Sequence, residues 1–187
     1  NSLYKKLINA SKPMIIIGQS VLNRDDSLQI YSLLETFTDK FNLIQEDWNG
    51  FNVLQLAAAR AGILEMGLIQ KNKSVDDLVA DAEKGKFKLV FSFGADEISY
   101  ENFSNCKIVY MGTHGDRGAN AADFILPAAA YTEKDAIFIN TEGRVQYANK
   151  ASFPPGEARE DWKIINQLSE LMKLDWSFIS QTDVRDS

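Results

Sequence analysis

The stretch that decides the fold is residues 111–161, which read MGTHGDRGANAADFILPAAAYTEKDAIFINTEGRVQYANKASFPPGEARED. It begins with a loop that has glycine at every third position, and a strand that ends at Pro127 follows. Proline ends a strand because it has no amide hydrogen for the next ladder bond. A strand–turn–strand pattern and a Pro-Pro-Gly sequence before a helix complete the stretch. These features predict the end of an α/β sheet, then a hairpin, then a C-terminal helix.

Strands and helices alternate upstream of this stretch. The run 14–17 is apolar on both faces, as expected in the interior of a parallel sheet. Ser74 is a candidate N-cap, and Gly62 and Gly85 are candidate helix stops. The alternation predicts an open, mostly parallel, Rossmann-like α/β sheet with helices on both faces. The expected strands are 14–17, 41–45, 87–93, 107–111 and 123–126, and the expected helices are 2–10, 27–37, 54–61 and 74–84.

The pattern changes at Ala136. Residues 136–140 and 144–147 predict a hairpin, and residues 159–173 predict a final helix. This helix would carry Trp162, Ile165, Leu168 and Met172 on one side. The polar tail from Ser180 is expected to be frayed. We therefore expect an α/β domain over 1–135, with a hairpin and C-terminal helix over 136–187 packed on it.

Composition excludes several classes of function. The chain has 187 residues, 45% of them hydrophobic, which is enough for a core. Its 26 acidic against 20 basic residues give a charge of -6, and no basic cluster is present, which argues against a nucleic-acid partner. No apolar run approaches the roughly 20 residues of a membrane span, so we expect no direct membrane insertion. Because the first residue is Asn1, we expect a processed or excised piece of a longer chain.

Metal-binding and catalytic side chains are scarce. Cys106 is the only cysteine and His114 the only histidine. An iron–sulfur cluster needs about four cysteine ligands, so none is expected in this segment. A catalytic histidine needs an orienting partner and a reacting hydroxyl or thiol, and the sequence shows neither beside His114. The sequence therefore predicts no catalytic residue and no metal ligand.

Three loops at strand ends could hold a ligand, because ligands of open α/β sheets bind beyond the carboxyl ends of strands. Two of them, 18–20 and 94–96, are expected to be tight turns. The third spans 112–118, where glycines permit positive φ and Arg117 could contact the phosphate of a pterin or nucleotide. Alternatively, Asp116 pairs with Arg117 or caps a short turn, and we favour this alternative. The candidates for a vestigial cofactor-binding loop are Gly112, His114, Gly115, Arg117 and Gly118.

Two longer strings carry a family resemblance. THGDRGANAADFILPAAAYTEKDAIFINTEGRVQ and PPGEAREDWKIINQLSEL resemble the C-terminal, molybdopterin-oxidoreductase-like region of the large iron–sulfur subunit of respiratory NADH:quinone oxidoreductase (complex I). KPMIIIGQSVL, EDWNGFNVLQLAAARAG and LVFSFGADE are similar to the same region, so the resemblance covers nearly the whole chain. ADFILPAAAYTEK and NTEGRVQ also resemble molybdopterin oxidoreductases generally, and PPGEAREDW with THGDRGA favours the complex I branch.

The resemblance implies a structural role. Subunits of this family pass electrons from NADH through Fe–S clusters in their N-terminal part towards quinone, and their molybdopterin-oxidoreductase-like part is regarded as having lost its cofactor. It implies no cofactor in this segment and other subunits of the peripheral arm as partners. It also implies a peripheral position on the cytoplasmic or matrix side of the inner membrane. Trp176 and Phe178 are candidate interface residues.

Two alternatives remain open. The chain could be the cofactor-binding fragment of a true molybdopterin oxidoreductase, with the 112–118 loop on a pterin nucleotide. It could also be a nucleotide-binding α/β domain, because KPMIIIGQSVL resembles the opening of such domains in thiamine-diphosphate enzymes.

Overall fold

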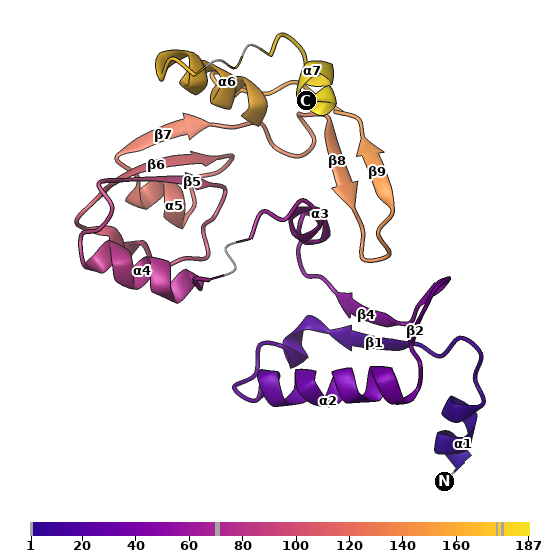
Figure 1. The fold of residues 1–187 in the computed structure, drawn as a ribbon. Coiled ribbons are helices and arrows are strands. Elements are labelled where there is room, and N and C mark those ends of the chain that lie inside the picture. The colour runs from indigo at the N-terminus through magenta and orange to yellow at the C-terminus, as the bar shows by residue number, and fades with distance from the viewer. Residues whose placement is uncertain (1, 70–71, 175, 177) are drawn as a thin grey trace. The chain divides into compact units, whose positions relative to one another are not determined.

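The computed structural model describes residues 2–69, 72–174, 176 and 178–187 (Figure 1). The chain divides into two compact units, each described by itself below. Unit 1 comprises residues 1–69 and 137–146, and unit 2 comprises residues 70–136 and 147–187. The predicted division into residues 1–135 and 136–187 differs from these two units, which are defined by contacts, and it stays a prediction.

Unit 1 is built on a pair of parallel strands. β1 and β4 pair in register from Ile15 opposite Phe51 to Gly18 opposite Leu54, and α2 runs along one side of them (Figure 1). Trp48 donates its indole N–H to the Pro13 carbonyl, at 2.8 Å. The elements are α1 (Ser2–Ile8), β1 (Ile15–Gly18), the 3-10 turn η1 (Gln19–Val21), α2 (Ser27–Lys40), β2 (Ile44–Gln45), β3 (Trp48–Asn49), β4 (Phe51–Leu54) and α3 (Arg60–Glu65).

The predicted helix over 54–61 is wrong. Of this range, only Leu54 lies in a strand, at the end of β4, which pairs with β1. Residues 55–59, which include three of the alanines, form a loop, and the helix begins only after them. Helix α3 begins at Arg60, continues through Gly62 and ends before Gly67. Gly67 has φ of 67°, and the Leu68 amide bonds back to the Ile63 carbonyl at 3.1 Å, as in a Schellman motif. The predicted strand over 41–45 is likewise shortened to β2.

Unit 2 is built on three parallel strands in the order β5-β6-β7. One face of the sheet is buried beneath α4, η2 and α5, around Tyr100, Phe103 and Ile108. On the other face Met111 packs with Ala128 and with Ile164 of α6. The elements are α4 (Val75–Glu83), β5 (Leu89–Phe93), the 3-10 turn η2 (Tyr100–Phe103), β6 (Lys107–Gly112), α5 (Arg117–Ala121), β7 (Phe124–Pro127), α6 (Asp161–Leu171) and α7 (Gln181–Asp186).

Helix α4 confirms its predicted signals. Ser74 forms a capping box with Asp77, and Gly85 adopts φ of 67° just after the last turn. Lys73 and Lys86, which lie beyond the two ends of the helix, both donate to the Asp81 carboxylate, at 2.7 and 2.6 Å. Local sequence signals were therefore sufficient to place this helix.

The C-terminal segment differs from its prediction in two ways. The buried side of α6 carries Ile164 and Leu168, whereas Met172 is 63% exposed, so the predicted stripe is partly wrong. The tail from Ser180 is also not frayed, because it forms α7 behind a Ser180–Asp183 capping box. Arg185 lies over the Tyr147 ring, 4.4 Å from its centroid, which ties α7 to the rest of unit 2.

The predicted hairpin is confirmed as β8 (Ala136–Ile139) and β9 (Val145–Ala148). Its turn closes through Asn140, whose side-chain oxygen accepts from the Glu142 and Arg144 amides, and Gly143 has φ of 80°. Parallel strands flanked by helices, followed by a hairpin and a C-terminal helix, confirm the predicted open α/β fold class. None of the described helices has the length and apolar character needed to cross a membrane.

Candidate functional site

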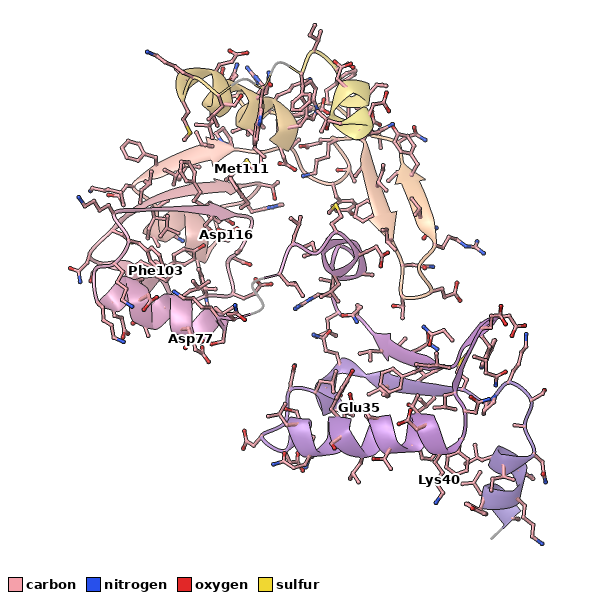
Figure 2. The ribbon with its side chains drawn as sticks, viewed as in Figure 1. Glu35, Lys40, Asp77, Phe103, Met111 and Asp116 are labelled. Carbon is pink, nitrogen blue, oxygen red and sulfur yellow. The ribbon has the colours of Figure 1, made fainter. Side chains whose placement is uncertain are left out.

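The loop after β6 lies where an open α/β sheet would bind a ligand. Because β5, β6 and β7 are parallel, their carboxyl ends lie at the same edge of the sheet. Residues 113–116 leave this edge and lead directly into α5. Figure 2 labels Met111, on β6, and Asp116, at the start of α5.

Asp116 caps α5 and also binds a buried tyrosine. Its Oδ1 accepts from the Ala119 amide at 3.0 Å, and its Oδ2 accepts from the Tyr110 hydroxyl at 2.5 Å. The Tyr110 hydrogen bond, followed by the Ala119 amide, lowers the pKa of Asp116. Burial, followed by the same hydrogen bond, raises the pKa of Tyr110. At neutral pH the pair is thus a neutral phenol that donates to a carboxylate.

The turn-capping alternative for Asp116 is therefore confirmed. The other alternative, an Asp116–Arg117 ion pair, is absent from the part of the chain that the structure describes. An ionised side chain at an N-cap satisfies helix donors that would otherwise lack a partner, and the helix dipole favours its charge.

The loop glycines serve a purpose that the sequence analysis did not predict. None of Gly112, Gly115 and Gly118 has positive φ, so the predicted use of these glycines is wrong. A Cβ on Gly112 would lie 2.2 Å from a carbon of the Tyr110 ring, and a Cβ on Gly118 would also lie 2.2 Å from a ring carbon. Two of the three glycines therefore make room for Tyr110, which is 1% exposed. A Cβ on Gly115 would meet no atom of the described residues within 4 Å.

Tyr110 is the residue that sequence reasoning missed. A strand alternates its faces with a period of two, so Tyr110 and Gly112 share a face of β6. A large aromatic residue two positions before a strand-ending glycine was the available signal. This signal could be interpreted only with the structure, which places Gly118 against the same face of β6 and against the Tyr110 ring.

His114 and Arg117 are exposed, and the structure does not bring them together over a ligand site. The His114 Nδ1 lies 2.7 Å from the hydroxyl of Thr113, so the expectation that no hydroxyl lies beside His114 is wrong. Arg117 instead lines an open groove of about 1150 Å³ beside η2, together with Lys88 and Cys106. Cys106 is half-buried, and burial raises the pKa of its thiol, which disfavours the reactive thiolate.

The other two strand-end loops are turns satisfied by the chain itself. Gln19 accepts the Leu56 amide at 2.9 Å within unit 1. In unit 2, Gly94 has φ of 64°, and the Ala95 carbonyl accepts the Tyr100 hydroxyl. Burial raises the pKa of Tyr100, and the carboxylates of Asp116, Asp96 and Glu97 raise it further. Asp96 and Glu97 follow β5, so together with Asp116 they place three carboxylates near this edge of the sheet.

Among the described residues no group of three or more His, Cys, Asp and Glu side chains could hold a metal ion. The buried carboxylate at the start of α6, that of Glu160, has hydrogen-bond partners within the chain. Glu160 is 8% exposed and accepts from Trp162 at 3.1 Å and from Lys163 at 3.0 Å. Although burial alone would raise the pKa of Glu160, these hydrogen bonds lower it.

Comparisons with known proteins give a consistent family assignment. A family model described as molybdopterin oxidoreductase matches residues 1–171. The NADH-ubiquinone oxidoreductase 75 kDa subunit of Reclinomonas americana is 44% identical over 180 residues, which cover 96% of this chain and 26% of that protein. The mitochondrial 78 kDa subunit of Candida albicans is 45% identical over 173 residues, which cover 91% of this chain and 23% of that protein.

A bacterial relative agrees with these two. It is a subunit of NADH-quinone oxidoreductase from Rickettsia bellii and is 39% identical over 181 residues, which cover 97% of this chain and 25% of that protein. The chain thus spans about a quarter of the length of the relatives it matches. Among solved structures, acetylene hydratase from Pelobacter acetylenicus gives a TM-score of 0.46 at 21% sequence identity. The match covers 54% of this chain and 16% of that one. The predicted resemblance is confirmed by the family model and the relatives.

Proposed function

Because this chain belongs to the molybdopterin oxidoreductase family, we propose that it is the C-terminal part of the large iron–sulfur subunit of NADH:quinone oxidoreductase. The observation that carries the proposal is identity of 39 to 45% across 91 to 97% of the chain with relatives named as subunits of this enzyme. Similarity to molybdopterin oxidoreductases alone would not separate this assignment from the alternative of a cofactor-binding enzyme fragment.

Within that subunit, the chain acts as a structural module. Electrons pass from NADH through Fe–S clusters to quinone, and the clusters lie in parts of the subunit outside these residues. The single cysteine and single histidine of the chain support this division of labour, since a cluster needs about four thiolate ligands. The self-satisfied loops at the three strand ends support a role without catalytic residues.

Other subunits of the peripheral arm are the proposed partners, on the cytoplasmic or matrix side of the inner membrane. The relatives' names as subunits support this, and so does the surface of unit 2 after α6. Leu171 is 80% exposed and Ile179 91% exposed, on either side of Trp176 at 49%. Trp176 and Phe178 line a largely apolar cavity of about 440 Å³. Exposed apolar surface of this kind is typical of protein interfaces.

The test uses the assembled complex from cells whose only copy of the subunit carries His114→Ala and Arg117→Ala. We expect NADH:quinone turnover per assembled complex to equal that of the unmodified complex, since neither side chain takes part in the reaction. Metal analysis should find iron but neither molybdenum nor tungsten. One molybdenum per subunit would instead support the pterin-enzyme alternative. Lost turnover in a normally assembled complex would contradict the structural role.

The nucleotide-binding alternative is tested separately. A ligand present at about 100 times its dissociation constant adds about 2.7 kcal/mol of stability. We expect no thermal shift of the chain with a panel of nucleotides.

A further inference from the structure

The family implies a molybdopterin cofactor, and the residues after β6 do not fit one. A molybdopterin carries a phosphate group, so a loop that binds it must supply free N–H donors, open space and a field that tolerates an anion. In an open α/β sheet the loop beyond a strand's carboxyl end meets these needs. Between Gly112 and the first turn of α5, the chain's own Tyr110 and Asp116 occupy the place where such a group would bind.

Two backbone donors at the start of α5 already face the Asp116 carboxylate. The Asp116 Oδ1 accepts the Ala119 amide at 3.0 Å, and the Gly118 amide also helps to lower the pKa of this carboxylate. The Asp116 carbonyl accepts the Asn120 side chain at 2.9 Å. The start of α5 favours a negative group, and the Asp116 carboxylate of the chain itself supplies it.

The space beside the loop is also filled. The Tyr110 ring lies against both Gly112 and Gly118, so closely that a Cβ at either position would lie 2.2 Å from a ring carbon. The Tyr110 hydroxyl donates to the Asp116 Oδ2 at 2.5 Å, which joins the ring and the carboxylate into one unit.

Three carboxylates near the loop also disfavour an added anion. Asp116, Asp96 and Glu97 are the carboxylates that raise the pKa of Tyr100 at this edge, so an added phosphate would meet like charges. Arg117, the cation that could have balanced them, lines the groove beside η2.

We propose that Tyr110 and Asp116 form a built-in plug, in which the carboxylate takes the place of a ligand's anion and the ring fills the space beside it. The plug excludes phosphate-bearing ligands, a pterin included, from the loop after β6. This inference rests on the proposed function for its choice of ligand. Its test involves no assembly into a complex, so its failure and that of the proposed function are separate results.

The first experiment follows the backbone amides of the 187-residue chain by NMR during titration with inorganic phosphate and with pyrophosphate. The first turn of α2, residues 27–29, is the internal reference, because its N-cap Asp26 makes no side-chain cap hydrogen bond. We expect the amides of residues 117–119 to move no more than this reference. A saturable shift at 117–119 that exceeds the reference would overturn the proposal.

The second experiment measures amide hydrogen exchange in Asp116→Ala, with Asp77→Ala in the α4 capping box as the matched control. Loss of a hydrogen bond to a carboxylate should speed exchange at Ala119 by about tenfold or more, and the control should leave Ala119 unchanged. Unchanged exchange at Ala119 in a folded Asp116→Ala would overturn the proposal.

Should Asp116→Ala fail to fold, Tyr110→Phe gives the deciding result. This variant keeps both the ring and the carboxylate, so its residues 117–119 should stay as insensitive to phosphate as in the unmodified chain. A saturable phosphate shift there would overturn the proposal.

Discussion

At the scale of single residues, Tyr110 determines which glycines of the loop are replaceable. A methyl group on Gly118 would lie 2.2 Å from its ring, and neither the strand nor α5 can move away without losing other contacts. We expect Gly118→Ala to lower the free energy of unfolding by about 1–3 kcal/mol, as overpacking does. Gly115→Ala is the matched control, since a Cβ there meets no atom of the described residues within 4 Å, and its effect should stay below about 1 kcal/mol. Urea unfolding measures both, and equal losses would show that Tyr110 does not confine Gly118.

Asp81 makes the stability of unit 2 depend on pH. Hydrogen bonds from Lys73, then from Lys86, lower the pKa of Asp81 to about 2. An aspartate has a pKa of about 3.9 in an unfolded chain, so the folded state holds the ionised form more strongly. This contribution is present in full above the unfolded pKa and is lost as pH falls from about 4 towards 2.

The corresponding test compares the chain with Asp81→Asn across this range. The variant should be less stable at pH 6, and the difference should shrink as pH falls towards 2, because Asp81 is then increasingly protonated. Asp26→Asn is the control, since Asp26 pairs with Arg24 at an exposed site where an ion pair contributes little. A stability difference independent of pH would show that the lysines do not act through the charge of Asp81.

At the scale of elements, α3 makes a testable distinction between two glycines. Gly62 lies inside the helix, and a Cβ there would make ordinary contact with Ile139 at 3.8 Å. Gly67 follows the helix with φ of 67°, where an L-residue is strained. We expect Gly62→Ala to raise the free energy of unfolding of α3 by about 0.5–1 kcal/mol, and Gly67→Ala to lower it by about 1 kcal/mol. Hydrogen exchange of the α3 amides gives both values. The reverse order would support the helix end at Gly62 that the sequence suggested.

The elements that could be predicted are those whose signals are local. Helix α4 has its cap at Ser74 and its stop at Gly85, both visible in sequence, and the capping role of Asp116 is local in the same way. Strand β4 could not be predicted from local signals. It forms by pairing with β1, which lies more than thirty residues earlier in the chain. Helix α7 was predictable in principle, since Ser180 and Asp183 have capping-box spacing, but the polar composition suggested disorder instead.

The candidate site shows the same difference between local signals, which the sequence reveals, and contacts that depend on the fold. The sequence places Gly112 and Gly118 in one loop, and their spacing suggested backbone freedom for a ligand. That they face a single tyrosine ring depends on which way β6 turns its side chains and on how α5 folds back, and neither is encoded in the loop itself. The packing of Gly112 and Gly118 against Tyr110 could therefore not be predicted from the loop sequence, and the list of cofactor-loop candidates stays a prediction.

At the scale of the whole molecule, the chain carries exposed apolar surface that its own packing does not cover. On β5, Leu89 and Phe93 are 48% and 53% exposed, and beyond α6 Ile179 is 91% exposed. A monomeric soluble protein rarely leaves large apolar patches in water, so such residues indicate contacts made elsewhere. Under the proposed function, we expect other subunits of the complex to cover part of this surface.

Ile179 gives the sharpest test of that view, because it is nearly fully exposed and lies beside the cavity lined by Trp176 and Phe178. In the isolated chain, Ile179→Asp should change the free energy of unfolding by no more than about 0.5 kcal/mol, as is usual for surface substitutions. In the complete complex the same carboxylate would be buried without a partner, at a cost of several kcal/mol, and the amount of assembled complex should fall at least tenfold. Asn9→Asp adds the same charge at another exposed position and should leave assembly unchanged.

Native gel electrophoresis with in-gel NADH dehydrogenase staining compares the amount of assembled complex in the two variants. Normal assembly with Ile179→Asp would mean that this surface of unit 2 faces water in the complex and that the partner contacts lie on another part of the chain.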